Sequence, residues 1–157
     1  MQLIVDTKQG PVEGRIRKEV VLFAGIPYAS PPVGILRFAP PAAPIQRPNL
    51  LNAKEFGPAS PQLPEEGLTD SHEVNWNEDC LTLNICTPSA DQTKRPVMVW
   101  IHGGGNTIGN SSFYQGAELV RNGRVVVVAI QYRMGPLGFL RHASLRNDRD
   151  PVEASGN

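Results

Sequence analysis

The stretch that decides the fold is residues 96–130, in which two apolar segments flank a glycine-rich turn and a candidate helix. The first segment, Pro96–Ile101, reads Pro-Val-Met-Val-Trp-Ile, and the second, Val125–Ile130, reads Val-Val-Val-Val-Ala-Ile. Between them, Gln115–Asn122 has the composition of a short helix, and Gly123 is placed to end it. Two apolar strands joined by a helical crossover indicate a βαβ unit in a sheet that is buried on both faces. The sequence therefore predicts an α/β fold.

The residues before this unit predict further strands and one long irregular segment. Apolar runs around a turn at Gly10-Pro11 indicate three short strands: Leu3–Val5, Val12–Ile16 and Val20–Ile26. A fourth strand is predicted at Cys80–Cys86, where apolar and polar residues alternate. Residues 27–64 are rich in proline, which does not fit inside a long helix or a central strand. We expect them to form a long covering loop braced by contacts with the rest of the domain.

Composition excludes several classes of protein. The 157 residues carry 15 Lys and Arg against 15 Asp and Glu, so charge gives no argument for binding nucleic acid or a membrane surface. With 40% hydrophobic and 19% charged residues, the chain does not have the composition of a disordered polyelectrolyte. Its longest strongly apolar run, Val125–Ile130, is too short to span a bilayer. The N-terminus lacks the pattern of a signal peptide, so we expect a soluble, cytoplasmic protein.

The two cysteines, Cys80 and Cys86, are too few for a disulfide scaffold. If both lie on one strand, their Cα atoms are about 20 Å apart, too far to bridge, so free thiols are expected. A reactive role for Cys80 is the alternative, but no cationic residue adjoins it, which favours a buried and inert thiol. The scattered histidines, His72, His102 and His142, do not pair with a cysteine at the spacing of metal ligands. We therefore expect no metal and no other cofactor.

The most informative motif is His102-Gly103-Gly104-Gly105, directly after the first apolar segment. Consecutive glycines cost backbone entropy, and they are useful where a ligand must approach the main chain closely. Their N–H groups can converge on an anion, although a flexible turn at a strand end is the alternative. The motif lacks the lysine of a nucleotide-binding Walker loop. His102 could act as a base, but a role in ordering the adjacent loop is favoured.

Other candidate catalytic residues have ordinary structural interpretations. Gly109–Phe113 nearly matches the Gly-x-Ser-x-Gly nucleophile motif, with Phe113 in place of the second glycine. That motif requires a strand that runs directly into it, whereas a loop precedes it here, so Ser111 is interpreted as a loop residue. The adjacent acids Glu78 and Asp79 point to opposite sides of an extended segment. A structural ion pair is therefore favoured over a shared catalytic site.

Four segments carry distinctive motifs, in this order: Phe23–Ala29 with Pro31–Gly34 and Leu36–Phe38; Glu78–Ile85; Pro96–Gly105; and Gln131–Leu140. Together they resemble the carboxylesterase/cholinesterase family, the type-B carboxylesterases. The resemblance implies an α/β-hydrolase fold with a mixed, mostly parallel central sheet, of which residues 1–157 form only the N-terminal portion of a single domain. It also implies hydrolysis of carboxylic esters by a Ser–Glu/Asp–His triad beyond Asn157. This chain alone is then expected to be inactive, and its partner to be the C-terminal remainder of the fold, on the same or a separate polypeptide.

The same resemblance assigns roles within the glycine turn. The N–H groups of Gly104 and Gly105 are expected to be oxyanion-hole donors, and Gly103 and Asn106 to contact the substrate, a small carboxylic ester. Family members usually have an aromatic residue where Asn106 stands. Ser60 occupies the position of a cysteine that, in cholinesterase-like members, pairs with the residue matched by Cys80. That disulfide should therefore be absent, which makes a bacterial-type, broad-specificity carboxylesterase the closer match.

Two functions stay open at this stage. The first is an esterase of which this chain is the N-terminal portion. The second is a catalytically inactive, adhesion-like binding module or a non-functional truncation. The intact Gly103–Gly105 run favours the esterase. Arg37 and Glu78 lie in family motifs at the two flanks of the proline-rich loop, so we expect them to pair and anchor it.

Overall fold

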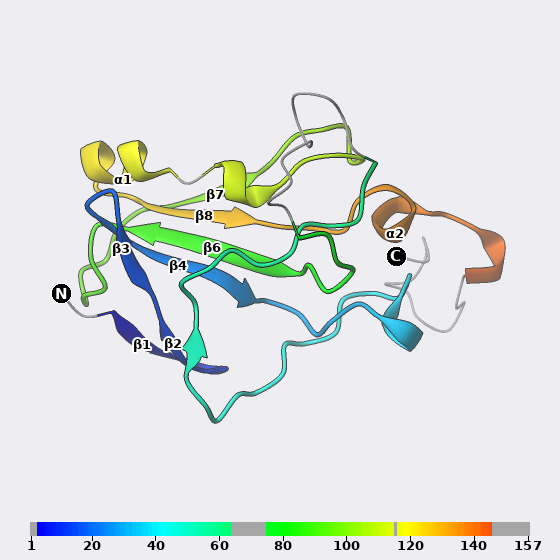
Figure 1. Cartoon of the computed structure of the whole chain (residues 1–157), viewed down its shortest axis with the longest axis horizontal. Coiled ribbons are helices and arrows are strands. Elements are labelled where there is room, and N and C mark those ends of the chain that lie inside the picture. Colours follow the sequence, from blue (N-terminus) through cyan, green and yellow to red (C-terminus); the bar gives the residue numbers. More distant parts are fainter. Residues whose placement is uncertain (1–2, 64–74, 115, 146–157) are drawn as a thin grey trace.

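The computed structural model describes residues 3–63, 75–114 and 116–145, which form two sheets with short helices around them (Figure 1). The larger sheet has the strand order β3-β4-β6-β8-β7, with β3 Arg15–Arg17, β4 Val20–Pro27, β6 Thr82–Thr87, β7 Val97–Ile101 and β8 Val126–Ile130. The smaller sheet has the order β1-β2-β5, with β1 Ile4–Thr7, β2 Gly10–Glu13 and β5 Leu51–Asn52. The helices are α1 Ala117–Gly123 and α2 Gly135–Phe139, with 3-10 turns at Gly34–Leu36, Ser111–Phe113 and Ala143–Leu145.

The predicted βαβ unit is confirmed. Strands β7 and β8 are parallel neighbours that pair along their whole length, from Val97 with Val126 to Ile101 with Ile130, and α1 connects them. The larger sheet is mixed, as expected, but within these residues β7 and β8 form its parallel pair and the other three neighbouring pairs are antiparallel. The mostly parallel character expected of the complete sheet is therefore not seen in this portion.

Helix α1 ends one residue later than the sequence predicts. Gly123 is its last helical residue, and Arg124 takes the left-handed conformation after it, with φ of 50° and its N–H bonded to the Val120 carbonyl. Gly123 was expected to be the first residue after the helix. That expectation was wrong, because Gly123 is still helical and Arg124 supplies the positive φ. The predicted first residue, Gln115, lies outside the described residues.

The core lies on both faces of the larger sheet. On one face, α1 packs Ala117 and Val120 against Val20, Cys86 and Val127. On the other face, Val12 of the smaller sheet and Ala53, which follows β5, pack against Val21 and Phe23. Figure 1 shows α1 and the smaller sheet on opposite sides of the central strands. The burial of these apolar side chains is the main stabilising contribution to this portion of the fold.

The apolar run Val12–Ile16 does not form one strand, as the sequence suggested. It divides at Gly14, so that β2 joins the smaller sheet and β3 the larger one. A Cβ atom at position 14 would lie 2.5 Å from the Leu22 carbonyl oxygen and 2.7 Å from the Phe23 ring. Only glycine allows the chain to cross the larger sheet this closely. The proposed turn residue Gly10 instead begins β2 with a φ of 118°.

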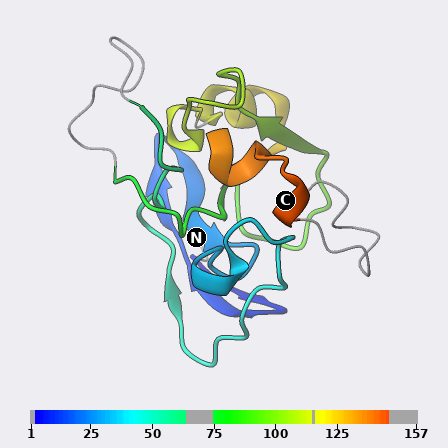
Figure 2. The same cartoon turned by 90° about the vertical axis from the view of Figure 1, so that its right-hand side faces the viewer.

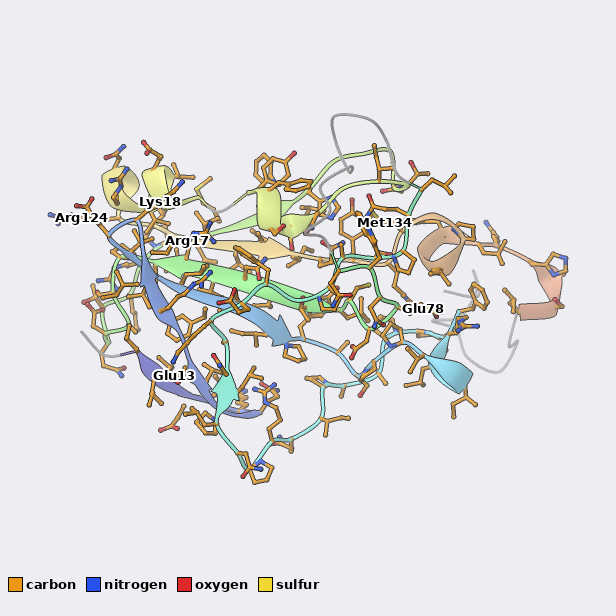
Figure 3. All side chains as sticks on the ribbon, in the orientation of Figure 1. Glu13, Arg17, Lys18, Glu78, Arg124 and Met134 are labelled. Carbon is orange, nitrogen blue, oxygen red and sulfur yellow. The ribbon has the colours of Figure 1, made fainter. Side chains whose placement is uncertain are left out.

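The proline-rich segment 27–64 is irregular in its described part, apart from the 3-10 turn at Gly34–Leu36 and the two-residue strand β5. The predicted anchor of this loop is confirmed: Arg37 donates from Nε and Nη2 to the two Glu78 carboxylate oxygens at 2.6 and 2.7 Å. The side chains are 46% and 25% exposed, so we expect the pair to contribute about 1 kcal/mol, less than a buried pair would. Figures 1 and 2 place the Gly34–Leu36 turn of this loop and α2 at the same end of the sheet, where Figure 3 labels Glu78 and Met134.

Strand β7 is the uncovered edge of the larger sheet. Its five residues are each between 45% and 65% exposed, although all are apolar: Val97, Met98, Val99, Trp100 and Ile101. The expectation that this strand is buried on both faces is therefore not met by the described residues. An apolar edge strand of this kind is a site for pairing with another segment of chain.

A buried polar network joins the larger sheet to the loop that follows the glycine turn. Asn84 of β6 accepts from the Gly25 N–H at 3.0 Å and donates to the Ser111 hydroxyl at 3.1 Å. The Ser111 N–H donates in turn to Oε1 of Gln131 at 2.9 Å. Asn84, Ser111 and Gln131 are all buried, so each contact replaces a hydrogen bond to water that burial removes. The geometry gives Ser111 a structural role.

Replacing Ser111 with alanine should lower the free energy of unfolding by about 1–2 kcal/mol, because the buried amide of Asn84 loses its acceptor. Urea unfolding measures this change in the full-length protein, which here means residues 1–157 joined to the C-terminal remainder of the fold. Ser144→Ala, which removes an exposed hydroxyl, serves as the control and should change stability by less than about 0.5 kcal/mol. Equal unfolding midpoints for the two variants would contradict the network's importance.

Both cysteines should titrate as free thiols. In the structure they are buried and unpaired with each other, and burial raises the pKa of each thiol to about 11. Ser60 is fully buried and hydrogen-bonds to Cys80. It stands where cholinesterase-like members have the cysteine that pairs with the residue matched by Cys80. Unreduced, denatured protein should react at two thiols, and native protein far more slowly, since only about one thiol in a thousand is ionised at pH 8. A count of zero in the denatured protein would show a disulfide.

Candidate active site

The glycine turn begins where β7 ends. Gly104 and Gly105 have φ of 120° and 58°, and Asn106 follows with 61°, so three consecutive residues have positive φ. The Gly104 carbonyl accepts three hydrogen bonds, from the N–H groups of Thr107 and Ile108 and from the Thr107 hydroxyl, at 3.0, 3.1 and 3.1 Å. A Cβ atom at position 104 would lie 2.0 Å from the Ile108 carbonyl oxygen, so the turn requires glycine there.

The outer side of this turn is open. A Cβ atom at Gly103 would meet no neighbour, and one at Gly105 would meet only the Thr107 hydroxyl, at 3.9 Å. All three glycines are exposed. Within the described part of the chain, the N–H groups of Gly104 and Gly105 donate to no protein acceptor. Two adjacent donors are therefore available to a ligand above a turn whose backbone is tightly bonded underneath.

His102 lies beneath the turn and is 2% exposed. Its Nδ1 lies 3.0 Å from the Gly103 carbonyl oxygen, which can only accept, so Nδ1 carries the proton. The ring stacks on Tyr132 with centroids 4.4 Å apart, and the Tyr132 hydroxyl donates to the His102 carbonyl at 2.6 Å. Burial lowers the pKa of His102, so the imidazole is neutral at pH 7. These contacts support an ordering role rather than that of a base.

The proline-rich loop braces the far end of the turn. The Gln62 side chain accepts from the Gly109 N–H at 2.8 Å and donates to the Gly109 carbonyl at 2.9 Å, so it holds one residue by both of its backbone groups. A Cβ atom at Gly109 would lie 2.4 Å from His102 Nδ1, which shows how closely this backbone packs on the imidazole. The role of Gln62 cannot be predicted from the sequence, because 47 residues separate it from its partner and no local motif marks it.

A shallow hollow of about 460 Å³ opens beside the glycines. Gly105, Asn106 and Thr107 form one side of it, and four residues of the segment around α2 form the other: Gly135, Pro136, Phe139 and Leu140. The Gly135 N–H donates to the Asn106 carbonyl at 2.6 Å and joins the two sides. The structure thus brings two of the four candidate residues, Gly105 and Asn106, to the edge of an open and largely apolar hollow, and Gly103 and Gly104 precede them in the chain.

The other candidates lie elsewhere or carry structural contacts. Arg37 engages both carboxylate oxygens of Glu78, which gives Glu78 the structural ion pair that the sequence favoured. In the described ranges, no three His, Cys, Asp or Glu side chains gather in an arrangement that could hold a metal ion. The helices described here are all too short or too polar to cross a bilayer.

Comparison with known proteins identifies the family. The model of the carboxylesterase family matches residues 1–151. Carboxylesterase 1E of Rattus norvegicus is 44% identical over 154 residues, covering 87% of this chain, and the para-nitrobenzyl esterase of Bacillus subtilis is 41% identical over 145 residues, covering 90%. The crystal structure of a Geobacillus stearothermophilus carboxylesterase superimposes with a TM-score of 0.85 at 38% identity, over 98% of this chain.

The match covers only part of each relative. This chain spans 27% of the rat protein, 29% of the Bacillus esterase and 31% of the Geobacillus structure. The resemblance found in four motifs of the sequence therefore extends over nearly the whole chain. Sequence identities of 38–44% accompany the same fold. This chain belongs to the carboxylesterase family and corresponds to the N-terminal portion of that family's α/β-hydrolase fold.

Proposed function

We propose that residues 1–157 supply two N–H donors, those of Gly104 and Gly105, to the oxyanion hole of a carboxylic ester hydrolase. The observation that carries this proposal is the pair of N–H groups at the exposed residues Gly104 and Gly105. These groups have no protein acceptor in the described residues, and hydrogen bonds to the Gly104 carbonyl hold the turn that carries them. Attack on an ester carbonyl places a negative charge on its oxygen, and preorganised N–H donors stabilise that charge by about 3–4 kcal/mol each. Such donors cost no reorganisation during the reaction, because the backbone already holds them in place.

The remaining catalytic groups belong to the remainder of the fold. In the α/β-hydrolase pattern, a serine attacks the ester carbon, a histidine accepts the serine proton and later gives it to the leaving alcohol, and an acidic residue orients the histidine. In chain order these residues follow the portion described here. Asn106 contacts the substrate from the side of the hollow, and Gly103 contacts it from the start of the glycine turn. The reaction uses no metal or other cofactor.

Strand β7 is where this remainder makes contact. Its five apolar residues are exposed at the sheet edge, and the glycine turn follows directly from its last residue, Ile101. A segment that covers β7 would therefore also lie close to Gly104 and Gly105. The relatives, of which this chain spans under a third, are long enough to supply that segment. The proposed partner is thus the C-terminal remainder of the hydrolase, whether joined to this chain or separate from it.

Replacing Gly105 with valine should lower kcat by about 100-fold or more in the full-length protein, with little change in KM. The strained, bulky residue displaces a donor that acts mainly in the transition state. Hydrolysis of a simple aryl ester measures both constants. Gly34→Val is the matched control, because Gly34 has a φ of 59° against 58° at Gly105 and equally open surroundings. An unchanged kcat in the Gly105 variant would refute the oxyanion role.

Residues 1–157 expressed alone should give insoluble or molten protein that does not hydrolyse p-nitrophenyl acetate above a buffer control. The exposed apolar strand β7 lacks its cover, and an uncovered patch of this kind promotes association between chains. Solubility, near-ultraviolet circular dichroism and hydrolysis rate test the three parts of this expectation. A soluble monomer that unfolds cooperatively would contradict it and favour an inactive binding module.

A further inference from the structure

We propose that His102 and Thr107 are positioning residues that aim the N–H groups of Gly104 and Gly105 at the oxyanion. This inference rests on the proposed function of the two glycines. Neither side chain is proposed to touch the substrate. Each side chain holds the carbonyl oxygen of one peptide unit. The N–H group that it orients lies at the opposite end of the same unit.

The planarity of the peptide bond makes this possible. In a trans peptide the C=O of one residue and the N–H of the next lie in one plane and point in opposite directions. The carbonyl of Gly103 therefore shares a rigid unit with the N–H of Gly104, and the carbonyl of Gly104 shares one with the N–H of Gly105. A hydrogen bond that holds either carbonyl fixes the direction of the donor at the other end.

His102 holds the first of these peptide units. Its Nδ1–H donates to the Gly103 carbonyl at 3.0 Å, so the Gly104 N–H points away from the imidazole. The ring cannot turn readily, because it is buried, stacked on Tyr132 at 4.4 Å and packed against the backbone of Gly109. The Tyr132 hydroxyl also fixes the preceding carbonyl, that of His102, at 2.6 Å.

Thr107 holds the second peptide unit. Its hydroxyl and its N–H both donate to the Gly104 carbonyl, at 3.1 and 3.0 Å, and the Ile108 N–H adds a third bond. The Gly105 N–H then points to the opposite side, which is the open side of the turn. Glycines alone would leave both units free to rotate, since they have access to both signs of φ. The His102 ring removes that freedom from the first unit, and the Thr107 hydroxyl, together with the two backbone N–H groups, removes it from the second.

The test uses an isosteric pair at position 107 and a donor-retaining pair at position 102. Thr107→Val removes the hydroxyl and keeps the shape, whereas Thr107→Ser keeps the hydroxyl. His102→Leu removes the ring donor, and His102→Asn retains an amide N–H near the position of Nδ1. Thr7→Val is the matched control, because the exposed Thr7 hydroxyl also donates to a glycine carbonyl, that of Gly10, at 2.6 Å in a distant turn.

The decisive measurement is the inhibition constant of an aryl trifluoromethyl ketone, whose carbonyl carbon adds the nucleophile's oxygen reversibly and leaves an oxyanion in the hole. In the full-length protein, Thr107→Val should weaken inhibition about 5-fold and His102→Leu about 50-fold. The value of kcat should fall in proportion, with KM within about 2-fold of the original. Thr107→Ser and Thr7→Val should match the original protein, and His102→Asn should recover part of the loss.

An inhibition constant reports affinity and does not depend on how much of the enzyme is folded. A fall in apparent kcat with an unchanged inhibition constant for Thr107→Val would show a merely structural role and overturn the proposal. An unchanged inhibition constant for His102→Leu, or no recovery by His102→Asn, would overturn the part assigned to His102. If Gly105→Val leaves kcat unaltered, the proposed function itself fails, whatever the effect of these variants.

Discussion

The parallel pairing of β7 with β8 is the constraint on which the rest of this structure depends. Because the two strands are in register to their last residues, Ile101 and Ile130, the segments that follow them leave the sheet side by side. One segment is the glycine turn and the other contains Tyr132 and the residues leading into α2. The stack of Tyr132 on His102 and the bond from Gly135 to Asn106 both follow from that register. A slip of one residue would turn the side chains of β7 to the opposite faces and separate these contacts.

Polar contacts, rather than apolar packing, hold the turn itself. Its glycines have no side chains to bury, so the backbone is fixed by hydrogen bonds from beneath, by the imidazole of His102, and by the clamp of Gln62 on Gly109. The bonded pair of Arg37 and Glu78 helps to hold the proline-rich loop that carries Gln62. Rigidity below the turn and free N–H donors above it are two consequences of the same arrangement.

In the described portion, both faces of the central strands are covered, but the edge strand β7 is not. Helix α1 and the smaller sheet cover the central strands, while β7 exposes apolar residues along its entire length. The glycine turn lies at the end of that uncovered strand. The relatives are more than three times as long as the part that this chain matches. An uncovered edge next to the glycine turn supports the proposal that the remaining catalytic groups come from the rest of the fold.

The sequence by itself determined the βαβ unit, the position of the glycine turn, the free cysteines and, through the family motifs, the pairing of Arg37 with Glu78. Apolar periodicity and glycine content are local properties, and they suffice to place strands and sharp turns. Only the tertiary structure decided where Val12–Ile16 divides and that Gln62 and Tyr132 brace the turn. The break at Gly14 arises from contact with Leu22 and Phe23 on the neighbouring strand, and the clamp at Gly109 joins residues 47 positions apart. Contacts of this kind depend on how the elements pack in space, and no local pattern of residues encodes them.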